Sequence, residues 1–413
     1  MRGYFVAAHT DSSHTLAFIC GTVLLNAIGA GLIIPVTPTL VSSLGSYSIA
    51  EAAIWGGYIA AIYAVMQFLC GPTLGALSDR FGRRPILLLS LAVLAADYMV
   101  MTLTSNLWVL FSGRLLAGIA SATYATAYAA TSDISPCTKR ATRFGLVGAF
   151  IGFGYVIGPV IGGILGSMGL RVPFYSAAAL TALTLTYGLF YLPETLPRGK
   201  RRTVVWRKAN PVGALLQAAS HPVLVWFFAA MFLFQFANFV YAAVWPYYTI
   251  EGFKWTTAQV GLSLAVVGLG FSGVKGGLIR WAIPRHGETN TALYGFGFSI
   301  AALIGFAFAP NTWTVVALLP LSALGAMLPP ALTALMCNTV SDDQQGAIQG
   351  ALTSIIGLTL VLSTLIMTRL FTFFTSDSTA PYYPGAPFLL AAILMFIAII
   401  PFKVAIKKSE YAL

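Results

Sequence analysis

Three charged side chains lie inside long apolar stretches of this sequence, where each could bind a proton or a counter-ion: Asp97, Arg114 and Lys275. A charge held away from water is costly and is usually paired or functional. Burial disfavours the charged form of a carboxyl group, which makes Asp97 a candidate proton carrier; a peripheral Asp that hydrogen-bonds a neighbouring helix is the alternative. Arg114 lies about seven residues inside its stretch, roughly 10 Å deep at 1.5 Å per helical residue. This depth favours a functional or gating role over an arginine that reaches back to water.

Side chains that could bind an organic ligand occur in the second half of the chain. Lys275 needs an anion, a partner acid or contact with water, and the apolar stretches of this half offer no internal acid. A ligand with a carboxylate or phosphate would satisfy it; a lysine that reaches water in a cavity is the alternative. A helical stripe of amides and aromatic rings suits amphipathic ligands, although such a stripe also serves for packing. Its members are Gln235, Asn238, Tyr241 and Trp245.

Residues 75–84 form a short charged segment between two apolar stretches, with the sequence Gly-Ala-Leu-Ser-Asp-Arg-Phe-Gly-Arg-Arg. Asp79 can pair with an arginine or accept amides at a neighbouring helix N-terminus. Such contacts would close one side of the molecule and break when it opens; a static loop clamp is the alternative. The gating candidates in this segment are Gly75, Asp79, Arg80, Gly82, Arg83 and Arg84.

Two further segments combine glycine with a kinking or charged residue. The run 154–163 contains Gly154, Gly158, Pro159, Gly162 and Gly163. In a membrane helix, glycine and proline at this density allow a kink and very close helix contact. The run 113–118 places Gly118 one helical turn after Arg114.

The elements that carry these residues are membrane-spanning helices. Hydrophobic residues make up 58% of the chain and charged residues 8%, against roughly 25% charged residues in a soluble domain. Each apolar stretch approaches or exceeds the ~20 residues that a transmembrane helix needs, and the stretches do not alternate as barrel strands do. We therefore predict an all-α integral membrane protein with twelve spans, near 16–44, 52–77, 85–104, 107–132, 143–168, 172–192, 222–248, 257–283, 288–309, 312–337, 344–369 and 386–405.

The basic residues predict the orientation. With the N-terminus inside, 18 of the 23 Lys and Arg residues fall in inner segments and only Arg171 and Lys254 in outer loops. This bias predicts cytoplasmic N- and C-termini. The net charge of +11 then faces anionic lipid headgroups, so no nucleic-acid partner is needed.

The longest polar interruption, 193–221, divides the predicted spans six and six. We expect an N-terminal bundle (1–192), a cytoplasmic linker (193–221) and a C-terminal bundle (222–413). Two bundles that rock against each other would bind a small-molecule substrate between them near the midplane. The segment 277–288 is a degenerate counterpart of 75–84 at the same position in the second half, without the Asp.

These segments resemble known signatures. The segment 75–84 resembles the loop between helices 2 and 3 of the major facilitator superfamily, and Arg114 matches the arginine of its helix-4 motif. The run 154–163 resembles the helix-5 motif of antiporters in its drug-efflux branch. Within that branch, the chain is most similar to the tetracycline/proton antiporters. The resemblance implies two six-helix bundles, alternating access, proton exchange and a place in the bacterial inner membrane.

The chain departs from that pattern at two acids. Asn26 stands where this family has an acid in helix 1, and Ser299 where it has one in helix 9. Asp97 is kept. Asn26 thus joins the substrate-binding candidates, and both the substrate and the proton stoichiometry are left open.

We therefore expect a monomeric exporter of a small amphipathic molecule, driven by proton exchange, with no cofactor and no metal. An organic-anion carrier or an uncoupled facilitator is the alternative. A membrane receptor or lipid-processing enzyme is disfavoured because the four histidines, His9, His14, His221 and His286, lie at or outside the ends of spans.

Overall fold

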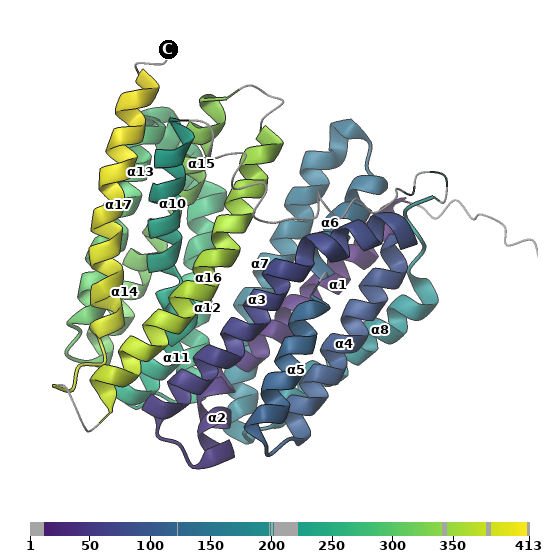
Figure 1. Ribbon diagram of the computed structural model, residues 1–413, viewed down its shortest axis with the longest axis horizontal. Coiled ribbons are helices and arrows are strands. Elements are labelled where there is room, and N and C mark those ends of the chain that lie inside the picture. Colours follow the sequence, from purple (N-terminus) through teal and green to yellow (C-terminus); the bar gives the residue numbers. More distant parts are fainter. Residues whose placement is uncertain are drawn as a thin grey trace, which may run out of the picture.

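The computed structural model describes residues 12–121, 123–197, 199, 201, 222–340, 345–376 and 381–410, and every regular element within them is helical. Figure 1 shows two groups of long helices, one from each half of the chain. The first group comprises α1 (Ser12–Ile33), α2 (Thr37–Gly45), α3 (Ile49–Phe81), α4 (Arg83–Leu103), α5 (Leu107–Ile119), α6 (Thr123–Asp133), α7 (Cys137–Met168) and α8 (Val172–Tyr191). The second comprises α10 (Leu224–Asn238), α11 (Val240–Phe253), α12 (Thr257–Gly273), α13 (Ile279–Ala307), α14 (Thr312–Leu324), α15 (Leu328–Asn338), α16 (Gln345–Thr375) and α17 (Ala386–Glu410).

Within the described residues, eleven helical stretches are long and apolar enough to cross a membrane. The stretch Thr257–Ala307 is 51 residues long and contains the eighth and ninth predicted spans. Its backbone leaves the helical conformation at Gly287, with φ 74° and ψ 167°, and this break separates the two spans. The predicted twelve-helix, all-α membrane fold is therefore confirmed. The predicted linker, 193–221, lies largely outside the described residues, so its boundaries stay a prediction.

Every third span is interrupted along its length. The first breaks between α1 and α2, the fourth between α5 and α6, the seventh between α10 and α11, and the tenth between α14 and α15. Interrupted helices are tolerated at membrane depth where they are buried in protein or line a cavity. These four spans are therefore the ones expected to surround a central cavity.

Glycines on α7 allow two helices to approach it closely. A Cβ atom on Gly158 would lie 2.7 Å from the carbonyl oxygen of Ile28 on α1, and one on Gly162 would collide with the carbonyl oxygen of Leu32. On another face of α7, a Cβ on Gly163 would lie 2.5 Å from the carbonyl oxygen of Thr257 on α12. The helix thus packs backbone to backbone within its own half and across to the other half.

The two halves meet at one end of the molecule and separate at the other (Figure 1). We call the end that carries residues 79–84 and the C-terminal end of α17 the motif end. At the opposite end, Thr372 donates a hydrogen bond to the carbonyl oxygen of Ala50 (2.6 Å) and Arg369 to the hydroxyl of Tyr58 (2.9 Å), both across the halves. Nearer the motif end, added Cβ atoms at glycines of α3, α7 and the segment after α12 would meet no atom within 4 Å: Gly71, Gly145, Gly152 and Gly276. The structure is therefore open at the motif end.

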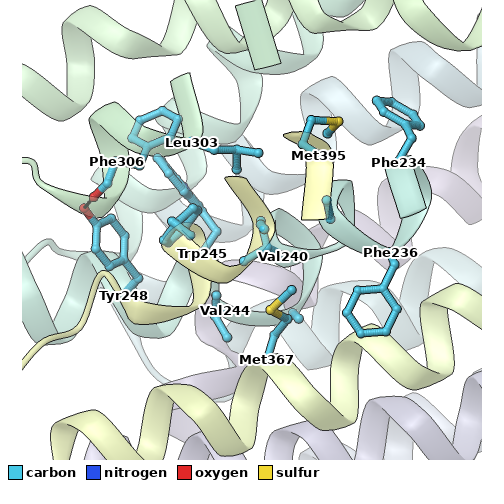
Figure 2. Packing of buried hydrophobic residues seen from close by; sticks show 14 of the residues in the cluster. Phe234, Phe236, Val240, Val244, Trp245, Tyr248, Leu303, Phe306, Met367 and Met395 are labelled. Atoms are coloured by element: carbon cyan, nitrogen blue, oxygen red, sulfur yellow. Dashed lines mark hydrogen bonds between the residues drawn. The ribbon is translucent and has the colours of Figure 1, made fainter. Parts of the chain in front are cut away.

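Aromatic rings fill the core of the second half. Trp245 lies edge-on to Phe306, with ring centroids 5.1 Å apart, and Tyr248 donates a hydrogen bond to the carbonyl oxygen of Phe306 (2.6 Å). Figure 2 shows these three side chains beside Leu303, with Met367 and Met395 farther along the same core. This packing holds α11 against α13.

The close contact of α7 with α1 leads to a stability prediction. Gly162→Ala should lower the stability of the purified protein by about 1–3 kcal/mol, because the new methyl group forces the two backbones apart. Gly152→Ala on the same helix is the matched control, since its Cβ would meet nothing within 4 Å. Thermal unfolding in detergent measures both, and equal midpoints for the two variants would contradict the account of this contact.

Candidate functional site

A buried ion pair joins α4 to α5 in the first half. The guanidinium of Arg114 donates a hydrogen bond to the carboxylate of Asp97, and the two residues are 8% and 3% exposed. The guanidinium also lies 5.6 Å from the ring centroids of both Tyr63 and Tyr98, within range of cation–π attraction. The structure therefore pairs two of the three intramembrane charges that the sequence singles out.

The local sequence brings the two charges together. A Cβ on Gly113 would lie 2.9 Å from Oδ1 of Asp97, so the absence of a side chain there lets α5 approach the carboxylate. The pair is not fully satisfied: Oδ1 of Asp97 and Nε of Arg114 have no hydrogen-bond partner in the described structure. One free acceptor on the carboxylate leaves room for a proton or a water molecule.

A cavity of about 280 Å³ lies between the two halves, next to this pair. Its walls come from α1 to α5 of the first half and from α11 and α16 of the second, so the interrupted tenth span, α14 and α15, does not line it. The polar or aromatic groups on its walls are Thr37, Tyr63, Arg114, Tyr247 and Thr364. The cavity is mostly apolar with a few polar groups, which is the usual character of a site for an organic molecule.

The seventh span presents a different face to this cavity from the one predicted. Trp245 is 2% exposed, and its indole N–H donates to the hydroxyl of Ser263 (2.9 Å) within the second half. Tyr241 packs beside it, 6.1 Å away between ring centroids. The cavity wall is formed instead by Ala242, Ala243, Pro246 and Tyr247. Tyr241 and Trp245 thus do not line this cavity; their large rings pack on Phe306 and Phe388, and a role in substrate binding stays a prediction.

The remaining substrate candidates lie apart from one another. Gln235 and Asn238 are partly buried and precede the break before α11. Asn26 lines a second, much smaller cavity inside the first half. Lys275 is exposed, and it follows Gly261 and Gly268 at intervals of seven residues. Gly261 and Gly268 pack on α7, and Lys275 lies beyond them, toward the motif end, in the π-helical turn Val274–Leu278.

Arg83 is the centre of the charged segment 75–84. Its side chain contacts Asp79 (2.6 Å), the hydroxyl of Ser78 (2.6 Å) and, at the end of α6, Asp133 (3.0 Å). Its backbone N–H donates to the carboxylate of Glu194, which follows α8 (2.8 Å). All these contacts join residues between 78 and 194. Among the residues that the structure describes, no hydrogen bond or ion pair joins the segment 75–84 to the second half.

Gly82 explains why this turn needs a glycine. Its φ of 110° falls in the region that side chains rarely adopt, and a Cβ there would collide with the carboxylate of Glu194. The glycine thus lets the linker acid reach the start of α4.

The sequence reasoning missed Tyr63, Tyr247 and Arg369. Tyr63 touches both cavities and the guanidinium of Arg114, and Arg369 bridges the halves at their closed end. The sequence does carry a hint of a polar site near Tyr63. Gln67, one helical turn after Tyr63, is an amide in the middle of an apolar span. Tyr247 and Arg369 carry no local signal, because Tyr247 packs on Phe371, far along the chain, and Arg369 bonds Tyr58 in the other half.

Comparison with known proteins agrees with this architecture. Residues 19–364 match the sequence profile of the Major Facilitator Superfamily. The class C tetracycline resistance protein of Escherichia coli is 38% identical over 389 residues, which cover 94% of this chain and 96% of that protein. The class H protein of Pasteurella multocida is 35% identical, covering 90% of this chain and 91% of its own length.

Solved structures share the fold at low sequence identity. The nucleoside transporter NupG superposes with a TM-score of 0.76 at 14% identity, covering 94% of this chain and 99% of its own. A bacterial homologue of the human lysosomal transporter Spinster, in an inward-facing and unoccupied conformation, gives 0.74 at 16% identity, covering 95% and 96%. From the matched profile, the identity to the tetracycline resistance proteins and the shared fold, we conclude that this chain belongs to the major facilitator superfamily of multi-pass membrane transporters.

Proposed function

We propose that this transporter exports a tetracycline-like, amphipathic drug across the bacterial inner membrane in exchange for protons, by alternating access. The names of its relatives supply the substrate class, since several tetracycline resistance proteins are 34–38% identical to it over most of the chain. Secondary transport fits because the substrate cavity lies between two halves that meet at one end only.

The observation that carries the proposal is the Asp97–Arg114 pair beside the shared cavity. While Asp97 is ionised, its charge holds the guanidinium of Arg114, which lines the cavity wall. A proton on Asp97 removes that negative charge. The guanidinium of Arg114 then faces the cavity and the rings of Tyr63 and Tyr98 without its counter-ion. Proton binding therefore changes the charge that the substrate meets, which is what exchange of the two requires.

The orientation follows from the basic residues. The motif end carries Arg80, Arg83, Arg84, Lys407 and Lys408, and we assign it to the cytoplasm, together with both termini. In that assignment the structure is inward-facing. Asp79 is then free to contact the second half when the motif end closes, and its partnership with Arg83 belongs to the open state.

An organic-anion carrier is the second candidate, and Lys275 is the observation that favours it. Lys275 is exposed and makes no ion pair with any residue that the structure describes. A carboxylate-bearing or zwitterionic substrate would find a partner there. Tetracycline-like drugs and organic acids are therefore distinguished by what Lys275 does to binding.

The remaining assignments extend this picture. We propose two six-helix bundles, 1–192 and 222–413, joined by the cytoplasmic linker 193–221, and a protein that works as a monomer. The basic residues at the motif end contact anionic lipid headgroups, and no nucleic-acid partner is required.

Asp97→Asn should abolish uphill transport driven by a pH gradient and leave substrate counterflow intact, because counterflow needs no net proton movement. Loss of a positioned proton carrier should slow gradient-driven uptake by about a hundredfold or more. Uptake of tetracycline into liposomes containing the purified protein, with and without a pH gradient, measures both modes. Unchanged gradient-driven uptake would remove Asp97 from the coupling mechanism.

Asp79→Asn should slow transport several-fold while leaving expression and thermal stability close to those of the unsubstituted protein. Arg83 keeps Asp133 and Ser78 as partners in the open state, so the cost arises when the motif end closes. Lys139→Gln, an exposed change at the same end, is the control. Transport by the Asp79 variant at the rate of this control would contradict the gating role.

Lys275→Gln should weaken binding of an anionic or zwitterionic substrate by about tenfold, or roughly 1.4 kcal/mol, and leave cationic dyes unaffected or bound more tightly. Equilibrium dialysis is the suitable measurement, because Trp245 is buried in the second half and is a poor reporter of the cavity. If every ligand binds the variant and the unsubstituted protein equally, Lys275 is only a solvated cavity residue.

A further inference from the structure

A small polar cavity lies inside the first half, separate from the one between the halves. Its volume is about 20 Å³, above the ~10–15 Å³ that one water molecule needs. Asn26, Ser90, Ser121 and Tyr124 line it, together with Tyr63 and Gln67. Polar groups from the first four spans therefore surround a space that is large enough for about one water molecule.

Buried polar atoms without hydrogen-bond partners lie on the wall of this space and in the ion pair beyond it. Nδ2 of Asn26 has no hydrogen-bond partner, although the residue is 7% exposed and lies on the cavity wall. Nearby, Oδ1 of Asp97 and Nε of Arg114 also have none. An unsatisfied buried group costs about 1–3 kcal/mol, and a water molecule in a polar cavity is the usual remedy.

The cavity lies next to the ion pair, on its motif-end side. On α4, which starts at the motif end, Ser90 lies seven residues before Asp97, so both occupy one face of the helix. On α5, which runs the opposite way, Ala117 lines the cavity and follows Arg114 by one turn. The larger cavity also touches Arg114, and Tyr63 lines both cavities. Tyr63, whose ring lies against the guanidinium of Arg114, thus stands between the two spaces.

We propose that the small cavity, which we call the inner water site, holds the water through which Asp97 exchanges its proton with the motif end, apart from the path of the drug. This inference rests on the proposed function, since it concerns the route of the coupled proton. The proton leaves the carboxyl group of Asp97 for a water oxygen, and the carboxylate then pairs again with Arg114.

The surroundings of the pair suit this step. The ionisable groups that face it are Arg114 from α5, Tyr63 from α3 and Tyr98 on α4 itself, with Tyr155 of α7 beyond them. None of these four residues carries a carboxyl group, so none of them offers a second carboxylate for the proton. Asn26 and Ser90 are buried, whereas Gln67 and Ser121 are partly exposed, which places the mouth of the site on the side of the latter two.

Filling the site tests the proposal. Ser121→Leu should occlude the water, whereas Ser121→Ala keeps the space. Ser112→Leu is the matched control: Ser112 is exposed on α5, in the same span as Ser121, and its hydroxyl bonds the backbone as that of Ser121 does. In liposomes, with tetracycline as the probe, Ser121→Leu should slow gradient-driven uptake about tenfold, leave counterflow within a factor of about two, and differ from both other variants.

A second readout needs no substrate. Hydroxyl-radical labelling of the purified protein modifies side chains that touch water, so labelling of Tyr124 should fall in Ser121→Leu and persist in Ser112→Leu. Unchanged labelling of Tyr124, or normal gradient-driven uptake by Ser121→Leu, overturns the proposal. Equal loss of uptake and counterflow also overturns it, in favour of a packing role.

Two variants distinguish the proton site, Asp97, from the inner water site. Normal gradient-driven uptake by Asp97→Asn would sink the proposed coupling site itself. Loss of coupling in Asp97→Asn, together with normal coupling in Ser121→Leu, would leave the proposed function intact and remove only the inner water site.

Discussion

An ionised side chain buried in a membrane protein must find its counter-charge within the protein, and this constraint organises the first half of the molecule. Arg114 lies in the middle of an apolar bundle, and Asp97 answers its charge from the neighbouring helix. Removing one partner of a buried pair typically costs about 3–5 kcal/mol, because the other charge is left alone. A proton on Asp97 creates that situation reversibly, and the rings of Tyr63 and Tyr98 are placed to share the freed charge. The pair is thus both a packing element and a site whose state depends on protonation.

The rest of the fold makes this local event matter to the whole transporter. Glycines on α7 bring it into backbone contact with α1 and α12, so one helix ties the first half to itself and to the second half. At the closed end, Thr372 and Arg369 hold α16 against α3 through single hydrogen bonds. Single hydrogen bonds contribute only about 0.5–1.5 kcal/mol each, so the backbone packing of α7 on α12 must also break when this end separates. At the motif end, Arg83 and Glu194 keep the charged segment attached to the first half alone.

Much of this could be predicted from the sequence, and the reasons differ by residue. Length and hydropathy predicted the spans, because a helix must satisfy its own backbone in lipid. Asp97 and Arg114 were noticeable because charges are rare in such spans, although their pairing depends on how α4 and α5 pack. For the stripe on the seventh span, the sequence left two readings open, since Tyr241 and Trp245 could equally line a cavity or fill a core; in the structure they fill the core. What decided it was the position of Phe306 and Phe388, more than 50 residues away in the chain. Contacts between the halves, such as that of Arg369 with Tyr58, left no trace in any local pattern.

The central claim is that the carboxyl group of Asp97 carries the exchanged proton and is linked to occupancy of the cavity. Infrared difference spectroscopy of the purified protein, recorded as tetracycline binds, observes protonated carboxyl groups directly. The account predicts a change in the carboxyl band on binding, together with proton release to the buffer, and loss of both in Asp97→Asn. A carboxyl band that does not respond to the drug, or one that responds equally in Asp97→Asn, would contradict it.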